Sequence, residues 1–553
     1  MASPLFTNTL PALLAAAAAA LLAPPAATAA PDALTLSPCR LSGVPHDAQC
    51  GVLKRPLDPA RADGPQIDIH VAVLPAVARN KKPDPVFFFA GGPGQSAIGL
   101  AGTLSRQFAR LGNRRDLVLV DQRGTGRSAP LMCAEDPPTT PLAEATDTAR
   151  ALRLLRECRV ALQQLPHGDL RRYTTTIAMQ DIDAVRAALG APQINAIGGS
   201  YGTRAVLEYM RQFPQQVRRA VIDGVAPPDM VLPASFSPDN QAALDGVFAA
   251  CEADPACQAR YPQLRADWQR LLASLPREAT LPHPVTLEPQ RITITRDTVI
   301  GQVRAPLYSP ALAAALPLAI TQAAAGRFEA LAGLAAALQA GGGRRMSMAA
   351  GMHFSVVCAE DVPRLGAAGV DAPGADFRND FARLYREVCS DWPRGEVPAG
   401  FYTMPPAPAA TLVLSGGIDP VTPPRHGARA TAALGAKARH VVVPNAGHGV
   451  MGMGCMRDVL FRFVDAADDA AALAVDADCA ARAPRPPAFQ PVQAPLAPPT
   501  PPTLPTSQTS QTSQTSQTPS APSTPSAPST SPTSTTLTSV KPSASAPAPG
   551  SRP

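Results

Sequence analysis

One serine lies between glycines, where an apolar run gives way to a helical pattern. The run is residues 193–197, the helical pattern is residues 203–213, and between them stands Gly198-Gly199-Ser200-Tyr201-Gly202. Glycines at 198 and 202 leave room for a tight strand-to-helix turn, so the Ser200 hydroxyl can stand at its tip as a nucleophile for acyl transfer. Alone, the pentapeptide is equally consistent with a chance match in a chain so rich in alanine and glycine.

A serine hydroxyl needs a base to take its proton and a carboxylate to orient that base. Asp419 lies in a glycine-rich loop after the apolar residues 411–414, and His448 lies in a similar loop after residues 440–443. The resulting order of serine, acid and histidine is that of α/β hydrolases. Asp223, at the end of an earlier apolar run, is the alternative acid. The other histidines lack a strand followed by glycine, although His353 could line a substrate cleft.

The negative oxygen that forms during acyl transfer needs hydrogen-bond donors. A short apolar run, 85–90, leads into Gly91-Gly92-Pro93-Gly94, whose glycines let the backbone approach a substrate oxygen. We assign the backbone N–H of Gly92 as one donor, with Gly91 as the near alternative. The other donor is the N–H of Tyr201, the residue after the nucleophile.

These residues require a sheet that brings loop ends together. Two antiparallel strands are expected at 51–57 and 67–74, followed by short continuous apolar runs that indicate parallel strands buried on both faces. Helical patterns cover 174–189, 241–253, 312–338 and 456–466. The predicted fold is therefore an α/β hydrolase with a mostly parallel central sheet, interrupted once by a mainly helical cap.

The predicted organisation has five parts. Residues 1–30 form a signal peptide, 31–229 and 407–484 form the two halves of the hydrolase core, 230–406 form the cap, and 485–553 form a disordered tail. The leader has an Ala/Leu run and small residues before the expected cleavage point, but no Lys or Arg before the run. The tail is made of Pro, Ser, Thr, Ala and Gln and cannot build a core. Export to the periplasm or the exterior is expected, with a possible envelope spacer in the tail.

Ten cysteines support export, because disulfides persist in oxidising compartments. None forms a C-x-x-C pair, so neither a zinc site nor another cofactor is expected. About 900 pairings are possible. Our hypothesis is sequential pairing, which closes five local loops: Cys39 with Cys50, Cys133 with Cys158, Cys251 with Cys257, Cys358 with Cys389, and Cys455 with Cys479.

The charge balance excludes one class of partner. The net charge is +6, only 5% of residues are aromatic, and no Lys/Arg cluster alternates with aromatic residues. Nucleic acid is therefore not an expected partner. The leader's apolar run is too short for a stable membrane span. A monomer is expected.

Taken together, the motifs resemble those of the prolyl iminopeptidase and tripeptidyl aminopeptidase group of secreted α/β-hydrolase serine peptidases, including its TAP-like C-terminal region. The resemblance spans residues 50–479 and rests on the glycine loop, the elbow, Asp419, His448 and Asp121-Gln122-Arg123-Gly124. Ala90 stands where the family's iminopeptidases have histidine, as in its tripeptidyl branch. Asp121 and Arg123 are interpreted as a structural pair under the oxyanion loop, and Thr422 as support for the acid loop.

The resemblance implies removal of one or a few residues from free peptide N-termini. An acidic anchor in the cap would then hold the substrate ammonium, and Glu360 is the first candidate, with Asp361 next. A solvated acidic turn is the alternative interpretation of these two residues. An esterase or lipase of the same fold is the nearest alternative function, and a non-catalytic envelope-binding protein is a more distant one.

Overall fold

The computed structural model describes residues 34–340, 348–366, 376–378 and 380–491. Nine strands form one sheet in the order β1-β2-β3-β5-β4-β6-β7-β10-β11. β1 to β3 and the β3–β5 pair are antiparallel, and the strands from β5 to β11 are mutually parallel. Their bounds are β1 Ser37–Cys39, β2 Ala48–Pro56, β3 Gln66–Leu74, β4 Val86–Phe89, β5 Leu117–Val120, β6 Ile194–Gly199, β7 Val217–Asp223, β10 Thr411–Gly416 and β11 Ala438–Val443. The predicted mostly parallel sheet is confirmed, and only β1 was missed.

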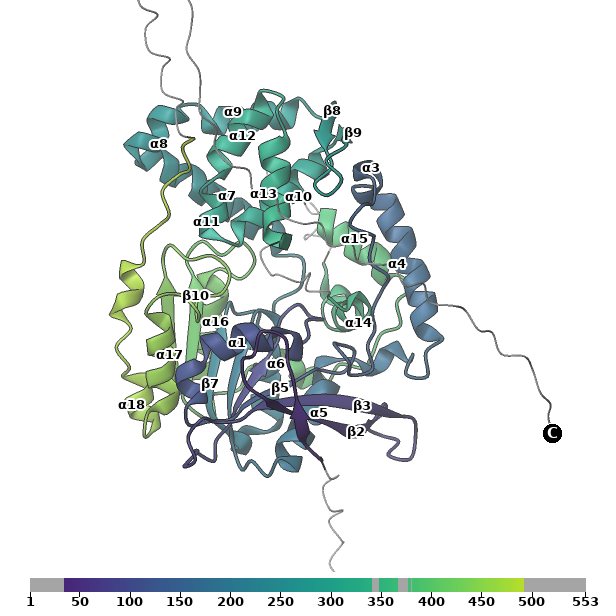
Figure 1. The fold of residues 1–553 in the computed structure, drawn as a ribbon, viewed down its shortest axis with the longest axis vertical. Coiled ribbons are helices and arrows are strands. Elements are labelled where there is room, and N and C mark those ends of the chain that lie inside the picture. The colour runs from purple at the N-terminus through teal and green to yellow at the C-terminus, as the bar shows by residue number, and fades with distance from the viewer. Residues whose placement is uncertain (1–33, 341–347, 367–375, 379, 492–553) are drawn as a thin grey trace, which may run out of the picture. The chain divides into compact units, whose positions relative to one another are not determined.

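The continuous apolar runs form strands covered on both faces. Neighbouring residues of one strand join separate clusters: Phe87 lies in one and Val86 in the other, and Val413 and Leu412 divide likewise. The first face carries α5 (Thr175–Ala188), α6 (Tyr201–Gln212) and α16 (Pro424–Leu434). The second carries α1 (Ala101–Gln107) and α17 (Met456–Asp465). Figure 1 shows helices on both sides of the sheet. Burial on both faces is why these strands lack alternation.

Between β7 and β10 the chain is mainly helical, with its own apolar cluster. The helices are α7 Phe236–Ala253, α8 Pro255–Arg260, α9 Leu264–Ala273, α10 Arg296–Leu307, α11 Pro310–Ala313, α12 Leu316–Ala324, α13 Glu329–Ala340, α14 Ala350–Glu360 and α15 Asp380–Cys389. The sequence missed the hairpin of β8 (Arg277–Pro282) and β9 (Pro289–Ile294), and the long helical pattern 312–338 is broken into three helices.

One helix of the predicted cap packs with the hydrolase core. Met352, Phe354 and Val357 of α14 belong to the same cluster as the sheet residues Phe87 and Val413. Another helix, α4 (Thr148–Gln163), had no counterpart in the sequence-based prediction, and it packs against α14 and α15. Arg156 of α4 bonds to Glu387 of α15 at 2.8 Å. The cap's base is therefore built from two separate parts of the chain.

All five predicted disulfides are confirmed, and the described residues contain no free cysteine. Along the described ranges, no helix is long and apolar enough to cross a membrane. The predicted signal peptide lies outside the described residues, as does the predicted tail beyond residue 491.

The first residues of the predicted tail lie against the cap helices. Tyr261 donates its hydroxyl to the carbonyl of Phe489, and the amide of Phe489 donates to the carbonyl of Ala314, at 2.7 and 2.8 Å.

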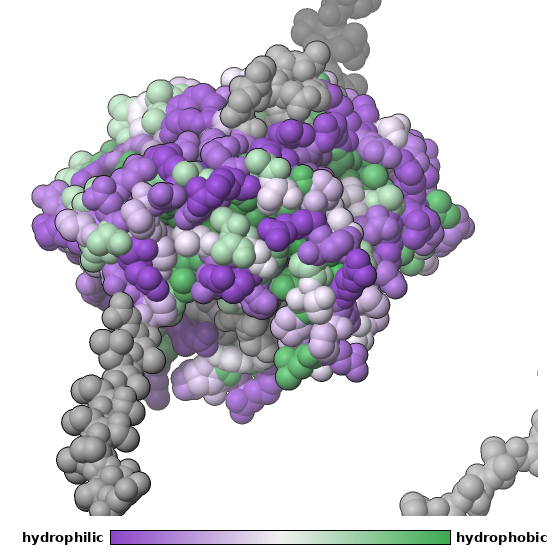
Figure 2. Space-filling model, turned by 90° about the horizontal axis from the view of Figure 1, so that it is seen from above, coloured by the Kyte–Doolittle hydropathy of each residue, from purple (hydrophilic) through white to green (hydrophobic). Residues whose placement is uncertain are grey.

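Seen from above, the molecule is mostly hydrophilic, with small hydrophobic groups separated by polar side chains (Figure 2).

Candidate active site

The serine elbow is a sharp turn between β6 and α6. Ser200 has φ 56° and ψ −126°, a conformation that a non-glycine residue adopts only when its surroundings impose it. A Cβ at Gly198 would lie 2.3 Å from the carbonyl oxygen of Gly202, and one at Gly202 would lie 2.0 Å from that of Phe89. Both positions therefore require glycine, as the sequence predicted.

Asp419 and His448 meet in the loops that follow β10 and β11. The Asp419 Oδ2 lies 2.8 Å from His448 Nδ1, and its Oδ1 accepts from the backbone of Val421 and of Thr422, both at 2.9 Å. The loops touch backbone to backbone, because a Cβ at Gly416 would lie 1.9 Å from the carbonyl oxygen of Gly447. The Thr422 hydroxyl donates to Asp419 at 2.8 Å, where the sequence placed it as support.

The contact between Asp419 and His448 shifts the pKa of both side chains. Burial alone would raise the pKa of the Asp419 carboxyl, but His448 and the hydrogen bonds outweigh it and hold that pKa below its usual value. Burial alone would lower the pKa of His448, but the Asp419 carboxylate raises it above 6.5. Because Nδ1 faces the carboxylate, Nε2 is left for a proton that arrives from another group.

Asp223, the alternative acid, has a different position. Its Oδ2 accepts from the backbone of Val450 and Met451, both at 2.8 Å, and its carbonyl accepts from the backbone of Ser200 at 2.9 Å. Burial raises the pKa of this carboxyl to about 6. Asp223 therefore joins the histidine loop to the serine elbow.

The histidine ring lies beside the elbow. A Cβ at Gly224, next to Asp223, would lie 3.2 Å from Cε1 of His448. Within the described part of the chain, no hydrogen bond links the Ser200 hydroxyl to His448. Such bonds are often long in unliganded enzymes and tighten when substrate binds.

The glycine loop lies directly over the serine. A Cβ at Gly91 would lie 3.2 Å from Cβ of Ser200. The Gly91 amide already donates to Oε1 of Gln95 at 3.2 Å. Among the described residues, the amides of Gly92 and Tyr201 have no hydrogen-bond partner. Of the two loop glycines, Gly92 is therefore the one whose donor is available.

Glu360 and Asp361, the predicted anchor of the substrate N-terminus, are enclosed. Their exposed fractions are 1% and 0%. Asp361 holds Arg204 through two hydrogen bonds of 2.9 and 3.1 Å, and Glu360 accepts from the backbone of Thr175 at 2.7 Å. Burial raises the pKa of Glu360 to about 7. A carboxylate so paired is not presented to a substrate, so this geometry argues against the predicted role and also against a solvated acidic turn.

The interpretation of Asp121 and Arg123 as a pair is wrong. Arg123 pairs with Asp181 of α5 at 2.6 Å. Asp121 accepts from the Ser96 hydroxyl at 2.6 Å and from the amide of Ile98 at 3.1 Å. Asp121 therefore holds the chain just after the glycine loop. The arginine ties the sheet to α5, a partner that sequence spacing could not reveal.

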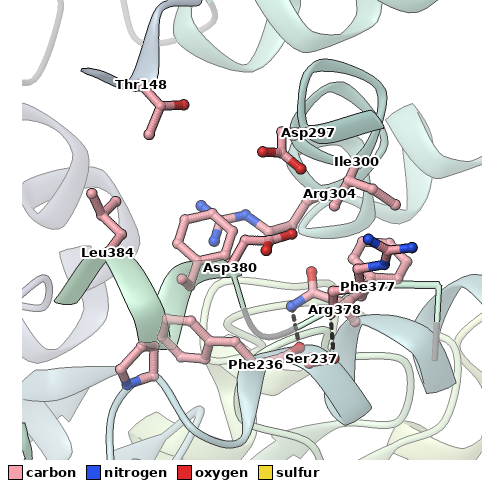
Figure 3. A pocket seen from close by; sticks show the side chains of 14 residues that line it. Thr148, Phe236, Ser237, Asp297, Ile300, Arg304, Phe377, Arg378, Asp380 and Leu384 are labelled. Atoms are coloured by element: carbon pink, nitrogen blue, oxygen red, sulfur yellow. Dashed lines mark hydrogen bonds between the residues drawn. The ribbon is translucent and has the colours of Figure 1, made fainter. Parts of the chain in front are cut away.

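A cavity of about 190 Å³ lies between the start of α4, at Thr148, and the helices that follow β7 (Figure 3). Its wall combines apolar and charged side chains from α7, α10, α15 and the segments beside them, including Phe236, Asp297, Ile300, Arg304, Phe377, Asp380 and Leu384. Its link to the catalytic residues is α10: one turn after Arg304, the Tyr308 ring meets the His448 ring edge-on at 5.3 Å. The Tyr308 carbonyl accepts from the His448 amide at 3.0 Å. No sequence pattern indicates this cavity, because its wall joins distant segments.

Within the described ranges, no group of three or more His, Cys, Asp or Glu side chains could hold a metal ion.

Comparison with known proteins gives two matches along the chain. Residues 84–291 match a family model described as the alpha/beta hydrolase fold, and residues 375–479 match one described as TAP-like protein. The predicted α/β-hydrolase fold and the resemblance to the peptidase group are thereby confirmed.

Several curated relatives carry peptidase names. The chain is 32% identical over 196 residues to the tripeptidyl aminopeptidase of Streptomyces lividans, which covers 34% of this chain and 36% of that protein. It is 29% identical over 300 residues to the serine protease Hip1 of Mycobacterium tuberculosis, 50% of this chain and 56% of that protein. The matches therefore span about a third to about half of these relatives. A crystal structure of proline iminopeptidase from Mycobacterium smegmatis aligns with 77% of this chain and 100% of that chain, at 16% identity and a TM-score of 0.34.

Proposed function

We propose, from the premise that this chain is an α/β hydrolase, that it is a serine aminopeptidase that removes one or a few residues from free peptide N-termini. One observation carries the proposal: an Asp419–His448 pair at 2.8 Å lies beside a serine held in a strained elbow. The names of the curated relatives support the choice of peptides as substrates.

In the proposed mechanism, Oγ of Ser200 attacks the scissile carbonyl while Nε2 of His448 takes the hydroxyl proton. Asp419 keeps the imidazole in the tautomer with hydrogen on Nδ1 and stabilises the imidazolium that forms. The carbonyl oxygen becomes negative and accepts from the amides of Gly92 and Tyr201. His448 then returns the proton to the leaving amine. Water then attacks the acyl-enzyme while His448 takes a proton from it, and His448 returns that proton to Oγ of Ser200 as the ester bond breaks.

The cavity in Figure 3 is the proposed place for the residues at the substrate's N-terminus. Its apolar wall suits side chains, and Asp297 supplies a carboxylate for the ammonium group. Asp380 supplies a second carboxylate, which also pairs with Arg383. Asp297 is exposed at the start of α10, whereas Glu360 and Asp361 are enclosed. We therefore assign the anchor to the cavity carboxylates, Asp297 first.

We also propose that the protein acts outside the cytoplasm. Five disulfides are typical of exported proteins. The predicted leader would direct the chain to the periplasm or the exterior, and the predicted tail would be a spacer to the envelope.

The first experiment compares Ser200→Ala with Ser105→Ala, a serine on α1 away from the elbow, using p-nitroanilides of one, two and three residues. We expect Ser200→Ala to lose hydrolysis and fluorophosphonate labelling, and Ser105→Ala to retain both. Hydrolysis by Ser200→Ala at the wild-type rate would refute the mechanism.

The second experiment separates a peptidase from an esterase. The same p-nitroanilides are compared with N-acetylated forms and with short acyl esters. Loss of activity on acetylation is expected, and Asp297→Asn should reduce the preference for free N-termini, while Glu278→Gln, on the exposed hairpin, should leave it unchanged. Equal rates on blocked substrates, with faster ester hydrolysis, would favour the esterase alternative.

A further inference from the structure

A buried histidine outside the proposed triad lies between the oxyanion loop and α15. His353, on α14, is only 9% exposed. Its Nδ1 lies 3.1 Å from the carbonyl oxygen of Pro93, the residue that follows Gly92. Its Nε2 lies 2.7 Å from the hydroxyl oxygen of Tyr385, on α15. His353 therefore joins a side chain of α15 to the loop that carries the proposed oxyanion donor.

The partners of His353 define which nitrogen carries hydrogen. A carbonyl oxygen only accepts, so Nδ1 must be the donor to Pro93. Burial lowers the pKa of His353, which favours the neutral ring. Nε2 of a neutral ring then accepts from the Tyr385 hydroxyl. Both hydrogen bonds therefore run in one direction, from Tyr385 through His353 to the Pro93 carbonyl, and Tyr385 sets the tautomer that the loop requires.

The start of α14 holds the loop at two consecutive carbonyls. The amide of Ala349 donates to the carbonyl of Gly94 at 3.0 Å, next to the bond from His353 to Pro93. Contact is close, because a Cβ at Gly94 would lie 2.9 Å from the carbonyl oxygen of Ala349. Within the loop itself, the backbone bond from Gln95 to Gly91 is longer, at 3.3 Å. The loop therefore takes much of its restraint from α14.

α14 is itself held firmly. The disulfide between Cys358 and Cys389 joins it to α15, so that His353 and Tyr385 face each other with their rings edge-on at 5.6 Å. Beside them, the indole of Trp392 donates to the Ser355 hydroxyl of α14 at 3.1 Å. A loop bonded to such a helix cannot drift independently.

We propose that His353, oriented by Tyr385, is a positioning residue that holds the Gly92 amide where the substrate oxyanion forms. It touches no reacting atom and acts through the Pro93 carbonyl. The inference rests on the proposed function, because it presumes acyl transfer at Ser200. It goes further by making α14 and α15 part of the oxyanion machinery.

The test compares His353→Phe, which removes both hydrogen bonds, with His353→Asn, whose amide nitrogen can replace Nδ1 as a donor. Tyr385→Phe removes only the orienting hydroxyl. We expect His353→Phe to lower kcat about 10- to 100-fold, below the loss for a deleted oxyanion donor, with KM little changed. His353→Asn should recover most of the rate, and Tyr385→Phe should lose less than His353→Phe.

Trp392→Phe is the matched control, since it removes a buried hydrogen bond to α14 without affecting the loop. It should lower the melting temperature and leave kcat per titrated active site unchanged. A second readout is inhibition by a peptide boronic acid, which forms a tetrahedral adduct on serine. Its affinity should fall in parallel with kcat in His353→Phe, whereas the affinity for a ground-state peptide product should not change.

The rate of fluorophosphonate labelling makes the two proposals distinguishable, because that reaction uses the serine and the oxyanion donors whatever the natural substrate. A wild-type protein that is not labelled overturns the proposed function and this inference with it. A labelled wild type together with folded His353→Phe and Tyr385→Phe variants that react at the wild-type rate overturns this inference alone. Equal losses in Trp392→Phe and His353→Phe would also overturn it, since the effect would then be general loosening of α14.

Discussion

Two clusters of buried charge border the serine elbow, and they treat their carboxylates in opposite ways. Asp419 faces a histidine whose side chain is 18% exposed, whereas Asp361 faces Arg204, of which nothing is exposed. The pKa of Asp419 is held below its usual value, while burial raises that of Glu360, beside Asp361, to about 7. The first cluster has the geometry of a proton-transfer pair, whereas the second is closed around a permanent cation.

The difference between the two partners, His448 and Arg204, shows what a proton-transfer pair requires. An imidazole changes its charge near neutral pH, but a guanidinium keeps its charge at every pH that a folded protein meets. Arg204 therefore serves to fix α6 to the segment after α14, and its carboxylates complete a closed network. Proximity of acids to the nucleophile is not sufficient for a catalytic role.

The largest effect is expected from a substitution that breaks the first cluster, the pair of Asp419 and His448. Asp419→Asn should lower kcat by about 10⁴-fold, because the amide leaves His448 in the wrong tautomer while geometry is kept. The measurement is kcat on free p-nitroanilide substrates, with the melting temperature as a check of folding. Asp223→Asn is the control, and a greater loss there than in Asp419→Asn would make Asp223 the orienting acid.

Breaking the second cluster should instead affect stability. Asp361→Ala leaves the Arg204 charge buried without its main partner, so the free energy of unfolding should fall by about 3–5 kcal/mol. Urea unfolding measures it, with active-site titration to show that kcat per folded molecule is retained. Asp245→Ala, which removes an exposed partner of Arg265, should cost less than about 1 kcal/mol. A kcat loss of 10³-fold without destabilisation would restore Asp361 as a substrate anchor.

The pH dependence of activity should report the first cluster. Nε2 of His448 must be unprotonated to accept the serine proton, and Asp419 raises the pKa of His448 above 6.5. Activity should therefore rise with pH through a midpoint above 6.5, read from kcat/KM of the free enzyme. A midpoint below 6.5 would contradict the electrostatic description of this pair.

The smallest expected effect concerns Glu360. Its pKa rises from 4.5 to about 7 on folding, so the folded protein binds more protons than the unfolded one between these values. This contribution to stability is complete below pH 4.5 and is lost as pH rises to about 7. Glu360→Gln should remove that pH dependence, so its stability relative to wild type should improve across this interval. The measurement is urea unfolding of both proteins at several pH values. A difference in the free energy of unfolding that stays constant across this interval would contradict the raised pKa.

Local patterns carried much of the fold and the site. The apolar runs identified β4 to β7, β10 and β11 because strands buried on both faces need continuous apolar residues. The strand β1 and the helix α4 were missed, since three residues make a weak pattern and Leu162 is the one residue of α4 that is buried. The cysteines paired sequentially because each pair closes a short loop.

The tertiary partners of two charged residues, Arg123 and Glu360, could not be predicted from the sequence. Arg123 was expected beside Asp121, two residues away, but its partner Asp181 lies 58 residues along the chain. Glu360 was interpreted from its type and its region, and its burial against Thr175 and Arg204 could not be read from either. A charged side chain pairs with whichever opposite charge lies near it in the folded protein. Sequence spacing predicts that distance only within a single turn or helix.

By itself, the sequence determined where Ser200, Asp419 and His448 stand relative to their strands, because glycines and apolar runs act through neighbouring residues. Only the tertiary structure decided which acid meets the histidine, which glycine amide remains free, and that α14 packs with the core as well as with α15. These outcomes depend on contacts that local patterns do not specify, such as the one between Asp419 and His448, 29 residues apart, and their energies arise only when the chain has folded.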